Sequence, residues 1–361
     1  MAQVHSNPAI THLLPLKAMP LQSHLKHLIE GRGTLTREQA RALMQAILAG
    51  ELTDIEIAAL LGALAARGET PAEIAGFVDI MRAAATHLPL SPTEQAILVD
   101  TCGTGGDGSR TFNISTAAAL VAAAAGASVA KHGNRAITSQ TGSADVLEAL
   151  GIPVDLSPVA ATAALRAHRF AFLHAPSLHP AMKAVMPVRR ALGIRTVFNL
   201  LGPLTNPAGA SAQVMGVYAP HVVPLVAEAM ALLGTRHAFV VHGQSETGTG
   251  LDEISISGPT HIAEVHNGIV TLSTITPEDA GLERAPIATL LGGDAPTNAA
   301  ILNAIFNGER GPRRDIVLLN AAAVLVAADL APDLITGVTL AAHTIDNGAV
   351  TQLIANLTRN I

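Results

Sequence analysis

The chain has 361 residues, and its 22 basic and 28 acidic side chains give a formal net charge of −6. This balance argues against a nucleic-acid partner, because contacts to phosphate need clustered Lys and Arg. Hydrophobic residues make up 49% of the chain, which excludes a disordered protein, and the single Cys excludes a disulfide framework, so a globular protein of two domains is expected.

Membrane association is not expected either. The longest apolar stretches, residues 117–130 and 316–328, are shorter than the roughly 18 residues that a spanning helix needs. Residues 1–20 lack the basic start and unbroken apolar run of a signal peptide. The sequence therefore predicts a cytoplasmic location, with residues 1–20 as a flexible extension.

Residues 21–95 have the pattern of a small helical domain. Thr36, Thr53 and Thr70 are each followed three residues later by Gln or Glu, which is the capping-box signature of a helix start. Four short helices are expected here. One of them is expected to bury a face made of Ile55, Leu60, Leu61 and Leu64.

From residue 96 onward, short β-branched runs alternate with helices, which is typical of an α/β domain with a parallel sheet. Strands are expected at residues 96–99, 128–130, 171–173, 213–217 and 238–241. Helices are expected at residues 115–125, 144–150, 296–306, 315–328 and 349–357. Asn267-Gly268 between two β-branched runs predicts a type I′ hairpin, so the sheet should be mixed but mostly parallel.

A glycine-rich turn, residues 100–108, follows the first of these strands. Its glycines allow backbone N–H groups to surround a phosphate, and the polar residues at 113–116 begin the next helix, where anions also bind. The turn formally matches a dinucleotide fingerprint, but Lys131 and His132 lie where that motif needs an acid, which disfavours a nicotinamide site. Cys102 is expected to be a packed residue and not a nucleophile.

Three further segments carry candidate chemistry. Residues 131–135 follow the second strand, so their Lys and Arg should share a sheet edge with the glycine-rich turn, unless they are solvated surface charges. Asp252 and Glu253 are adjacent loop acids that either bind Mg²⁺ or lie exposed in water. Arg189, on a helix start at residues 179–190, either holds a carboxylate or is an ordinary surface Arg.

Together these segments resemble the anthranilate phosphoribosyltransferase family of tryptophan biosynthesis. The matching motifs occur in family order over nearly the whole chain after the first twenty residues. They are Gly103-Thr-Gly-Gly-Asp107, Asn113-Ile-Ser-Thr116, Lys131-His-Gly-Asn-Arg135, Gly142-Ser-Ala-Asp145, His179-Pro-Ala-Met-Lys183, Arg195-Thr-Val-Phe-Asn199 and Gly250-Leu-Asp-Glu253.

The resemblance implies a small all-helical domain, residues 21–95 with a returning segment at about 179–207, and a larger α/β domain, residues 96–178 and 208–361. It implies a homodimer joined through the helical domain. The implied reaction transfers the 5-phosphoribosyl group of 5-phosphoribosyl 1-pyrophosphate to the amine of anthranilate, with Mg²⁺ as cofactor and pyrophosphate as product.

The resemblance also implies roles for individual residues. The phosphoribosyl donor would be bound by Gly103, Gly106, Asp107, Thr111, Asn113, Ile114, Ser115, Thr116, Lys131, His132, Gly133, Asn134, Arg135, Ser139 and Ser143. Anthranilate would be bound by Gly103, His132, Asn134 and Arg189. Mg²⁺ would be held by Ser115, Asp252 and Glu253. His132, as a proton acceptor or orienting group, and Arg189, on the anthranilate carboxylate, would be the catalytic residues.

The chain departs from the family pattern in three places: the extension before Leu21 is long, Gln140 replaces a basic residue, and residues 244–249 form a lengthened loop. Two rival functions remain at this point. One is a pyrimidine nucleoside phosphorylase, which would use inorganic phosphate instead of the diphosphate donor. The other is a non-catalytic nucleic-acid-binding relative, which the net charge of −6 disfavours.

Overall fold

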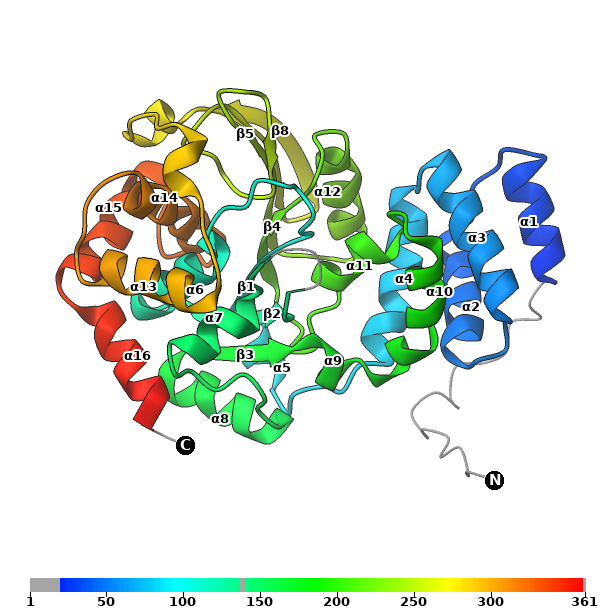
Figure 1. The fold of residues 1–361 in the computed structure, drawn as a ribbon. Coiled ribbons are helices and arrows are strands. Elements are labelled where there is room, and N and C mark those ends of the chain that lie inside the picture. The colour runs from blue at the N-terminus through cyan, green and yellow to red at the C-terminus, as the bar shows by residue number, and fades with distance from the viewer. Residues whose placement is uncertain (1–19, 137–139, 360–361) are drawn as a thin grey trace. The chain divides into compact units, whose positions relative to one another are not determined.

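The computed structural model of the chain describes residues 20–136 and 140–359, which form two compact units (Figure 1). The helical unit comprises the chain up to Thr86 together with His179–Thr205, and the α/β unit comprises His87–Leu178 and the chain from Asn206 onward. The expected N-terminal extension lies, apart from Pro20, outside the described residues.

The helical unit contains the four N-terminal helices expected from the sequence. Its elements are α1 (Leu21–Ile29), α2 (Arg37–Leu48), α3 (Asp54–Arg67), α4 (Pro71–Ala83), the 3-10 helix η2 (Pro180–Ala184), α10 (Met186–Leu192) and α11 (Phe198–Leu204). The capping boxes at Thr36, Thr53 and Thr70 all form, with each hydroxyl accepting from the backbone N–H three residues on. Helix α2 packs on α4, and α1 packs on α3.

One expectation about α3 is wrong. Ile55 is 83% exposed, whereas Ile57 is 2% exposed and lies on the buried face with the three leucines. Counting three, four and seven residues on from position 57 gives Leu60, Leu61 and Leu64, which is the spacing of one helix face. Ile55, in the first turn of α3, does not fit this series.

The α/β unit holds the sheet and the remaining helices. Its strands are β1 (Leu98–Gly103), β2 (Ser128–Gly133), β3 (Phe170–His174), β4 (Ala212–Gly216), β5 (His237–Gln244), β6 (Gly250–Leu251), β7 (Thr260–His266) and β8 (Ile269–Ile275). Its helices are α5 (Pro92–Gln95), α6 (Ile114–Ala124), α7 (Ser143–Ala149), α8 (Pro158–His168), α9 (Ala175–Leu178), α12 (Val222–Leu232), η3 (Pro277–Ala280), η4 (Ile287–Leu290), α13 (Ala295–Phe306), α14 (Pro312–Ala327), α15 (Leu334–Asp346) and α16 (Ala349–Arg359).

The sheet has the order β3-β2-β1-β4-β5-β7-β8, with β6 paired to β5. Strands β3, β2, β1, β4 and β5 are parallel, and β6, β7 and β8 are antiparallel, which confirms the mixed, mostly parallel sheet. The hairpin between β7 and β8 turns at Asn267 and Gly268, both at positive φ as a type I′ turn requires. Strand β1 begins at Leu98, two residues later than expected.

Helices cover both faces of the sheet (Figure 1). Alternate residues of β1 and β2 face opposite cores: Val99 and Val129 belong to the core that also contains α6 and α14. Leu98 and Ala130 pack instead in the smaller core that contains α8. Among the described residues, no helix combines the length and apolar character needed to cross a membrane.

Candidate functional site

The glycine-rich turn lies at the point where the strand order reverses. The chain proceeds from β1 to β2 on one side and later returns to place β4 on the other side of β1. In open α/β sheets, ligands bind at such a switch point, outside the carboxyl ends of the strands. The last residues of these two strands, Gly103 and Gly216, are register partners. The turn itself continues at positive φ through Gly105 and Gly106.

A short hairpin brings the acidic pair to the same edge. After β5, the loop of residues 244–249 is held by Ser245, whose backbone N–H donates to the carbonyl of Thr249 at 2.8 Å. Strand β6 then runs back along the end of β5 and delivers Asp252 and Glu253. The pair is anchored on both sides by apolar residues, because Leu251 and Ile254 are fully buried.

Hydrogen bonds bring these distant segments together. One carboxylate oxygen of Asp252 accepts from the N–H of Gly105 at 2.7 Å, and its own N–H donates to Asp107 at 3.2 Å. Glu253 accepts from the N–H of Ser115, in the first turn of α6, at 3.0 Å. The glycine-rich turn, the start of α6 and the acidic pair therefore form one cluster.

The electrostatics of this cluster favour a cation. Burial, with the neighbouring charge of Asp107, raises the pKa of Asp252 to about 7, and burial with the charge of Asp252 raises the pKa of Glu253 to about 8. Within residues 20–136 and 140–359, no three His, Cys, Asp or Glu side chains are arranged to hold a metal by themselves. Two carboxylates fit Mg²⁺, which commonly binds one or two acids together with substrate phosphates.

Lys131 lies beneath the cluster and is not a surface charge. It lies within β2 and not in the loop after it, and it is fully buried. Its ammonium group donates to the carbonyl of Thr101 at 2.6 Å and contacts the hydroxyl of Ser115 at 3.4 Å. Burial lowers the pKa of Lys131, while Glu253 and Asp252 oppose that shift. The interpretation of Lys131 as a solvated charge is therefore wrong.

A second buried carboxylate fixes the end of β2. Asp100 is fully buried and accepts from the backbone N–H of His132 at 3.0 Å. Burial raises the pKa of Asp100 to about 6, although a hydrogen bond from Asn206 and the charge of Lys131 oppose the shift. Cys102 is buried, and burial raises the pKa of its thiol well above the usual value, which agrees with a packed residue.

The start of α6 is tied to the C-terminal helices. The side chain of Asn113 donates to the carbonyl of Thr141 at 3.2 Å and accepts from Asn298 at 2.9 Å. Thr111 forms a bridge with Leu291. Ile114 and Thr116 are buried within the helix packing.

The remaining candidates of the 131–143 region lie around the start of α7. Gly133 is close to Ser143, because a Cβ added at Gly133 would come within 3.3 Å of the Ser143 Cβ. The carbonyl of Asn134 accepts from the N–H of Ala144 at 3.3 Å. Arg135 is half-exposed and paired with Glu148 at 2.6 Å. Ser139 lies outside the described residues.

Arg189 belongs to the helical unit, on α10. Burial lowers its pKa, and its guanidinium lies 5.5 Å from the ring centre of Phe198 and 3.9 Å from the sulfur of Met186. Among the described residues, no carboxylate lies within ion-pair distance of it. Its donor groups are thus largely desolvated without a protein anion to compensate.

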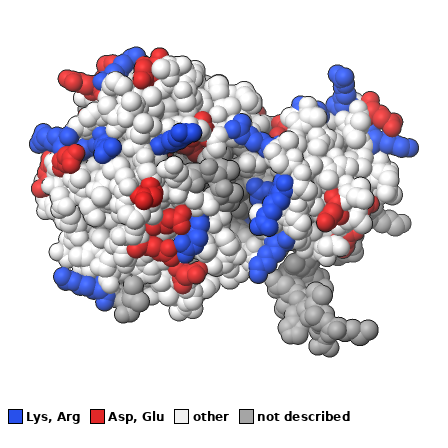
Figure 2. Space-filling model, viewed as in Figure 1, with Lys and Arg blue, Asp and Glu red and all other residues white. Residues whose placement is uncertain are grey.

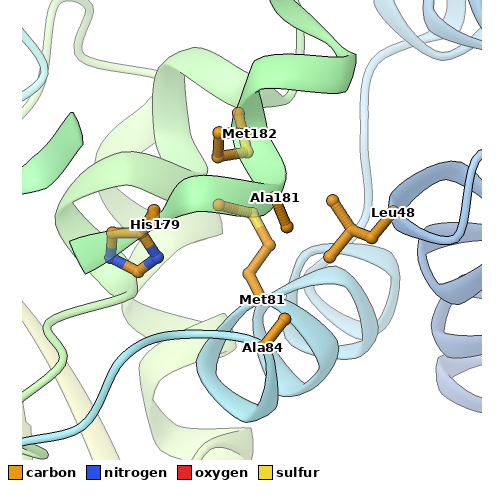
Figure 3. A pocket seen from close by; sticks show the side chains of 6 residues that line it. All are labelled: Leu48, Met81, Ala84, His179, Ala181 and Met182. Carbon is orange, nitrogen blue, oxygen red and sulfur yellow. The ribbon is translucent and has the colours of Figure 1, made fainter. Parts of the chain in front are cut away.

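A cavity within the helical unit is too small for a substrate. It measures about 10 Å³ and is lined by Leu48, Met81, Ala84, His179, Ala181 and Met182 (Figure 3). Such a volume holds a single water molecule at most. Residues 179–182 therefore pack the returning segment onto the helical bundle.

Charged side chains of both signs are spread over the surface of the α/β unit. On the face shown in Figure 2, basic and acidic side chains are interspersed.

Sequence reasoning missed the residues that support the acidic pair. Gly216 is the last residue of β4, and Gly243 lies within β5. Their role near the acidic pair can be recognised only when the strands are placed side by side. Asn320 did carry a signal, because it is the one polar residue in the apolar run 316–328. A buried amide in such a run needs hydrogen-bond partners.

Comparison with known proteins places these features in a family. Residues 22–85 match the glycosyl transferase family, helical bundle domain, and residues 95–351 match the glycosyl transferase family, a/b domain. The chain is 51% identical over 337 residues to the anthranilate phosphoribosyltransferase of Symbiobacterium thermophilum, covering 93% of this chain and 96% of the relative.

Solved structures agree with the sequence match. The crystal structure of anthranilate phosphoribosyltransferase from Thermus thermophilus aligns with a TM-score of 0.84 and 45% identity, over 92% of this chain and 98% of that one. The Saccharomyces cerevisiae enzyme in complex with PRPP and Mg aligns with a TM-score of 0.80 and 27% identity, over 94% and 96% of the two chains.

Proposed function

The chain belongs to the anthranilate phosphoribosyltransferases of the glycosyl transferase family, and we infer that it transfers the 5-phosphoribosyl group from 5-phosphoribosyl 1-pyrophosphate to the amine of anthranilate, the second step of tryptophan biosynthesis from chorismate. The observation that carries this function is the cluster at the switch point of the sheet. There a glycine-rich turn, the start of α6 and two acids meet at the ends of adjacent parallel strands. That arrangement suits a sugar diphosphate accompanied by a divalent cation.

On the donor, the glycine-rich turn and the start of α6 would supply N–H groups to phosphate oxygens. Ser115, Asp252 and Glu253 would hold Mg²⁺, whose charge would neutralise the departing pyrophosphate. Lys131, beneath Ser115, would add a fixed positive charge on the same side. Gly103, Gly106, Asp107, Thr111, Asn113, Ile114, Thr116, Gly133, Asn134, Arg135, Ser139 and Ser143 would complete the donor site.

In the reaction, the amine nitrogen of anthranilate forms a bond to the anomeric carbon while the bond from that carbon to the pyrophosphate oxygen breaks. Positive charge develops on the sugar and negative charge on the leaving group, so charge stabilisation and positioning do most of the work. The nitrogen then releases one proton. His132 is the proposed acceptor or orienting group for that proton.

On the acceptor, Arg189 would bind the carboxylate of anthranilate, with Gly103, His132 and Asn134 completing its site. The support for this role is a desolvated guanidinium without an ion pair among the described residues. A planar guanidinium suits a carboxylate, because it donates two parallel hydrogen bonds.

The chain would function as a homodimer through its helical unit. Ile29 on α1 is 59% exposed and Ile55 on α3 is 83% exposed, and these two helices pack on each other. Exposed aliphatic side chains on adjacent helices suit a partner surface. Light scattering on the purified chain should give twice the monomer mass, and Ile55→Lys should shift the protein toward monomer.

One assay tests the function directly. The purified chain, donor, Mg²⁺ and anthranilate should together cause the loss of anthranilate fluorescence and release pyrophosphate. Omitting either Mg²⁺ or donor should abolish the loss. A chain that instead cleaves pyrimidine nucleosides with inorganic phosphate, and leaves anthranilate unchanged, would refute the assignment.

A further inference from the structure

The acidic pair is carried by a segment, residues 252–255, that crosses the ends of three neighbouring strands. A glycine stands on each strand where the segment passes: Gly103 on β1, Gly216 on β4 and Gly243 on β5. A Cβ added at Gly216 would overlap the backbone oxygen of Asp252. One added at Gly243 would come within 2.5 Å of the backbone oxygen of Glu253. None of the three has a positive φ, so the close approach of the segment is what requires glycine.

A buried side chain on α14 holds the same segment through hydrogen bonds. The amide of Asn320 accepts from the N–H of Ile254 at 2.9 Å and donates to the carbonyl of Ile254 at 2.9 Å. Its second amide hydrogen binds the carbonyl of Ile316 at 2.9 Å. Asn320 is 2% exposed, and its polar atoms are directed at the residue after Glu253.

Two further bonds close the segment. The N–H of Ser255 donates to the hydroxyl of Thr260 at 3.0 Å, and the hydroxyl of Ser255 donates to the carbonyl of Gln244 at 2.7 Å. The backbone around Asp252 and Glu253 is thus fixed by strand ends that contact it closely and by side chains that bind it. The carboxylates have little freedom to adjust by moving the main chain.

We propose that Gly216 and Asn320 are positioning residues for the metal-binding carboxylates, acting through the backbone of Asp252, Glu253 and Ile254. This inference rests on the proposed function, because it takes these acids to hold Mg²⁺. Mg²⁺ demands near-ideal octahedral geometry, so a displaced carboxylate loses much of its affinity. Residues that support ligands in this way typically change metal affinity about 10–100-fold when replaced.

The test uses Asn320→Leu, which removes both bonds to Ile254 from an otherwise apolar helix, and Gly216→Ala, which displaces Asp252 without removing a hydrogen bond. The matched control is Gly76→Ala in the helical unit. Its added Cβ would come within 2.8 Å of the Ala40 Cβ and would overlap the carbonyl of Arg37, so it imposes a backbone clash away from the acidic pair. Melting curves identify the folded variants.

The readout is calorimetric titration of 5-phosphoribosyl 1-pyrophosphate into the full chain, with and without Mg²⁺, together with steady-state kinetics. In both variants, the factor by which Mg²⁺ increases the affinity for the donor should fall about tenfold or more. The KM for anthranilate should stay unchanged. Gly76→Ala should lower the melting temperature and leave donor affinity as in the natural chain. If Gly216→Ala does not fold, Asn320→Leu decides.

Two different results would contradict the inference, and only one of them would also contradict the proposed function. Folded variants that bind the donor with unaltered Mg²⁺ dependence would overturn the positioning role alone. A natural chain that shows no Mg²⁺-dependent donor binding would overturn the proposed function and this inference with it.

Discussion

Replacing Arg189 with Ala should weaken anthranilate binding far more than donor binding. A hydrogen bond to a charged group contributes about 1.5–3 kcal/mol. Since about 1.4 kcal/mol corresponds to a factor of ten, the KM for anthranilate should rise roughly 10- to 150-fold in Arg189→Ala. The stability cost should be small, because among the described residues the guanidinium forms no ion pair and lies against the ring of Phe198 and the sulfur of Met186.

The next residue on the helix gives a matched control. Arg190 is exposed, so Arg190→Ala removes an equal charge without removing the proposed carboxylate partner. Steady-state kinetics with anthranilate and donor varied separately would measure both constants. An unchanged KM for anthranilate in Arg189→Ala, or an equal rise for both substrates, would refute the assignment, and so would an equal effect in Arg190→Ala.

Three further predictions concern charge. Asp252→Asn should raise the Mg²⁺ concentration for half-maximal turnover by about tenfold or more, and an unaltered Mg²⁺ titration would contradict the ligand role. The pKa values of Asp252 and Glu253 are raised to about 7 and about 8, and a carboxyl group must lose its proton before it binds Mg²⁺. Mg²⁺-dependent donor binding should therefore strengthen as the pH rises through about 7 to 8, which calorimetry at several pH values would check. Glu73→Ala should lower the free energy of unfolding by about 3–5 kcal/mol, since Glu73 is fully buried and binds Arg67. Glu56→Ala, in an exposed capping box, should cost much less, and equal losses on chemical denaturation would contradict the role of burial.

Local signals in the sequence predicted much of the architecture. The capping boxes gave the N-terminal helices, and Asn267-Gly268 gave the hairpin, because both depend on neighbouring residues only. Helices α8, α12 and α15 were not expected. Helix α12 begins with two valines and a proline, and α15 contains a glycine and β-branched residues, so burial against the sheet and other helices overrides weak helix propensity there.

The chemistry of the site was predictable segment by segment, but its assembly was not. Lys131 was expected in the loop after the strand, because the β-branched run predicted a strand only over residues 128–130. Its place in β2 depends on Thr101 and Ser115, which belong to other elements. The assigned roles of individual residues in binding donor, anthranilate and Mg²⁺ stay predictions.

The acidic pair shows why the contacts that support a site between distant segments cannot be predicted from the sequence. Burying Asp252 and Glu253 beside each other and near Asp107 opposes folding, as their raised pKa values indicate. The flanking apolar residues and the hydrogen bonds from Asn320 offset that cost, and Asn320 lies 66 residues from Ile254 in the sequence. A cluster of buried carboxylates is unfavourable by itself and persists only where the surrounding packing determines it, which is why its supports lie in the fold and not in the motif.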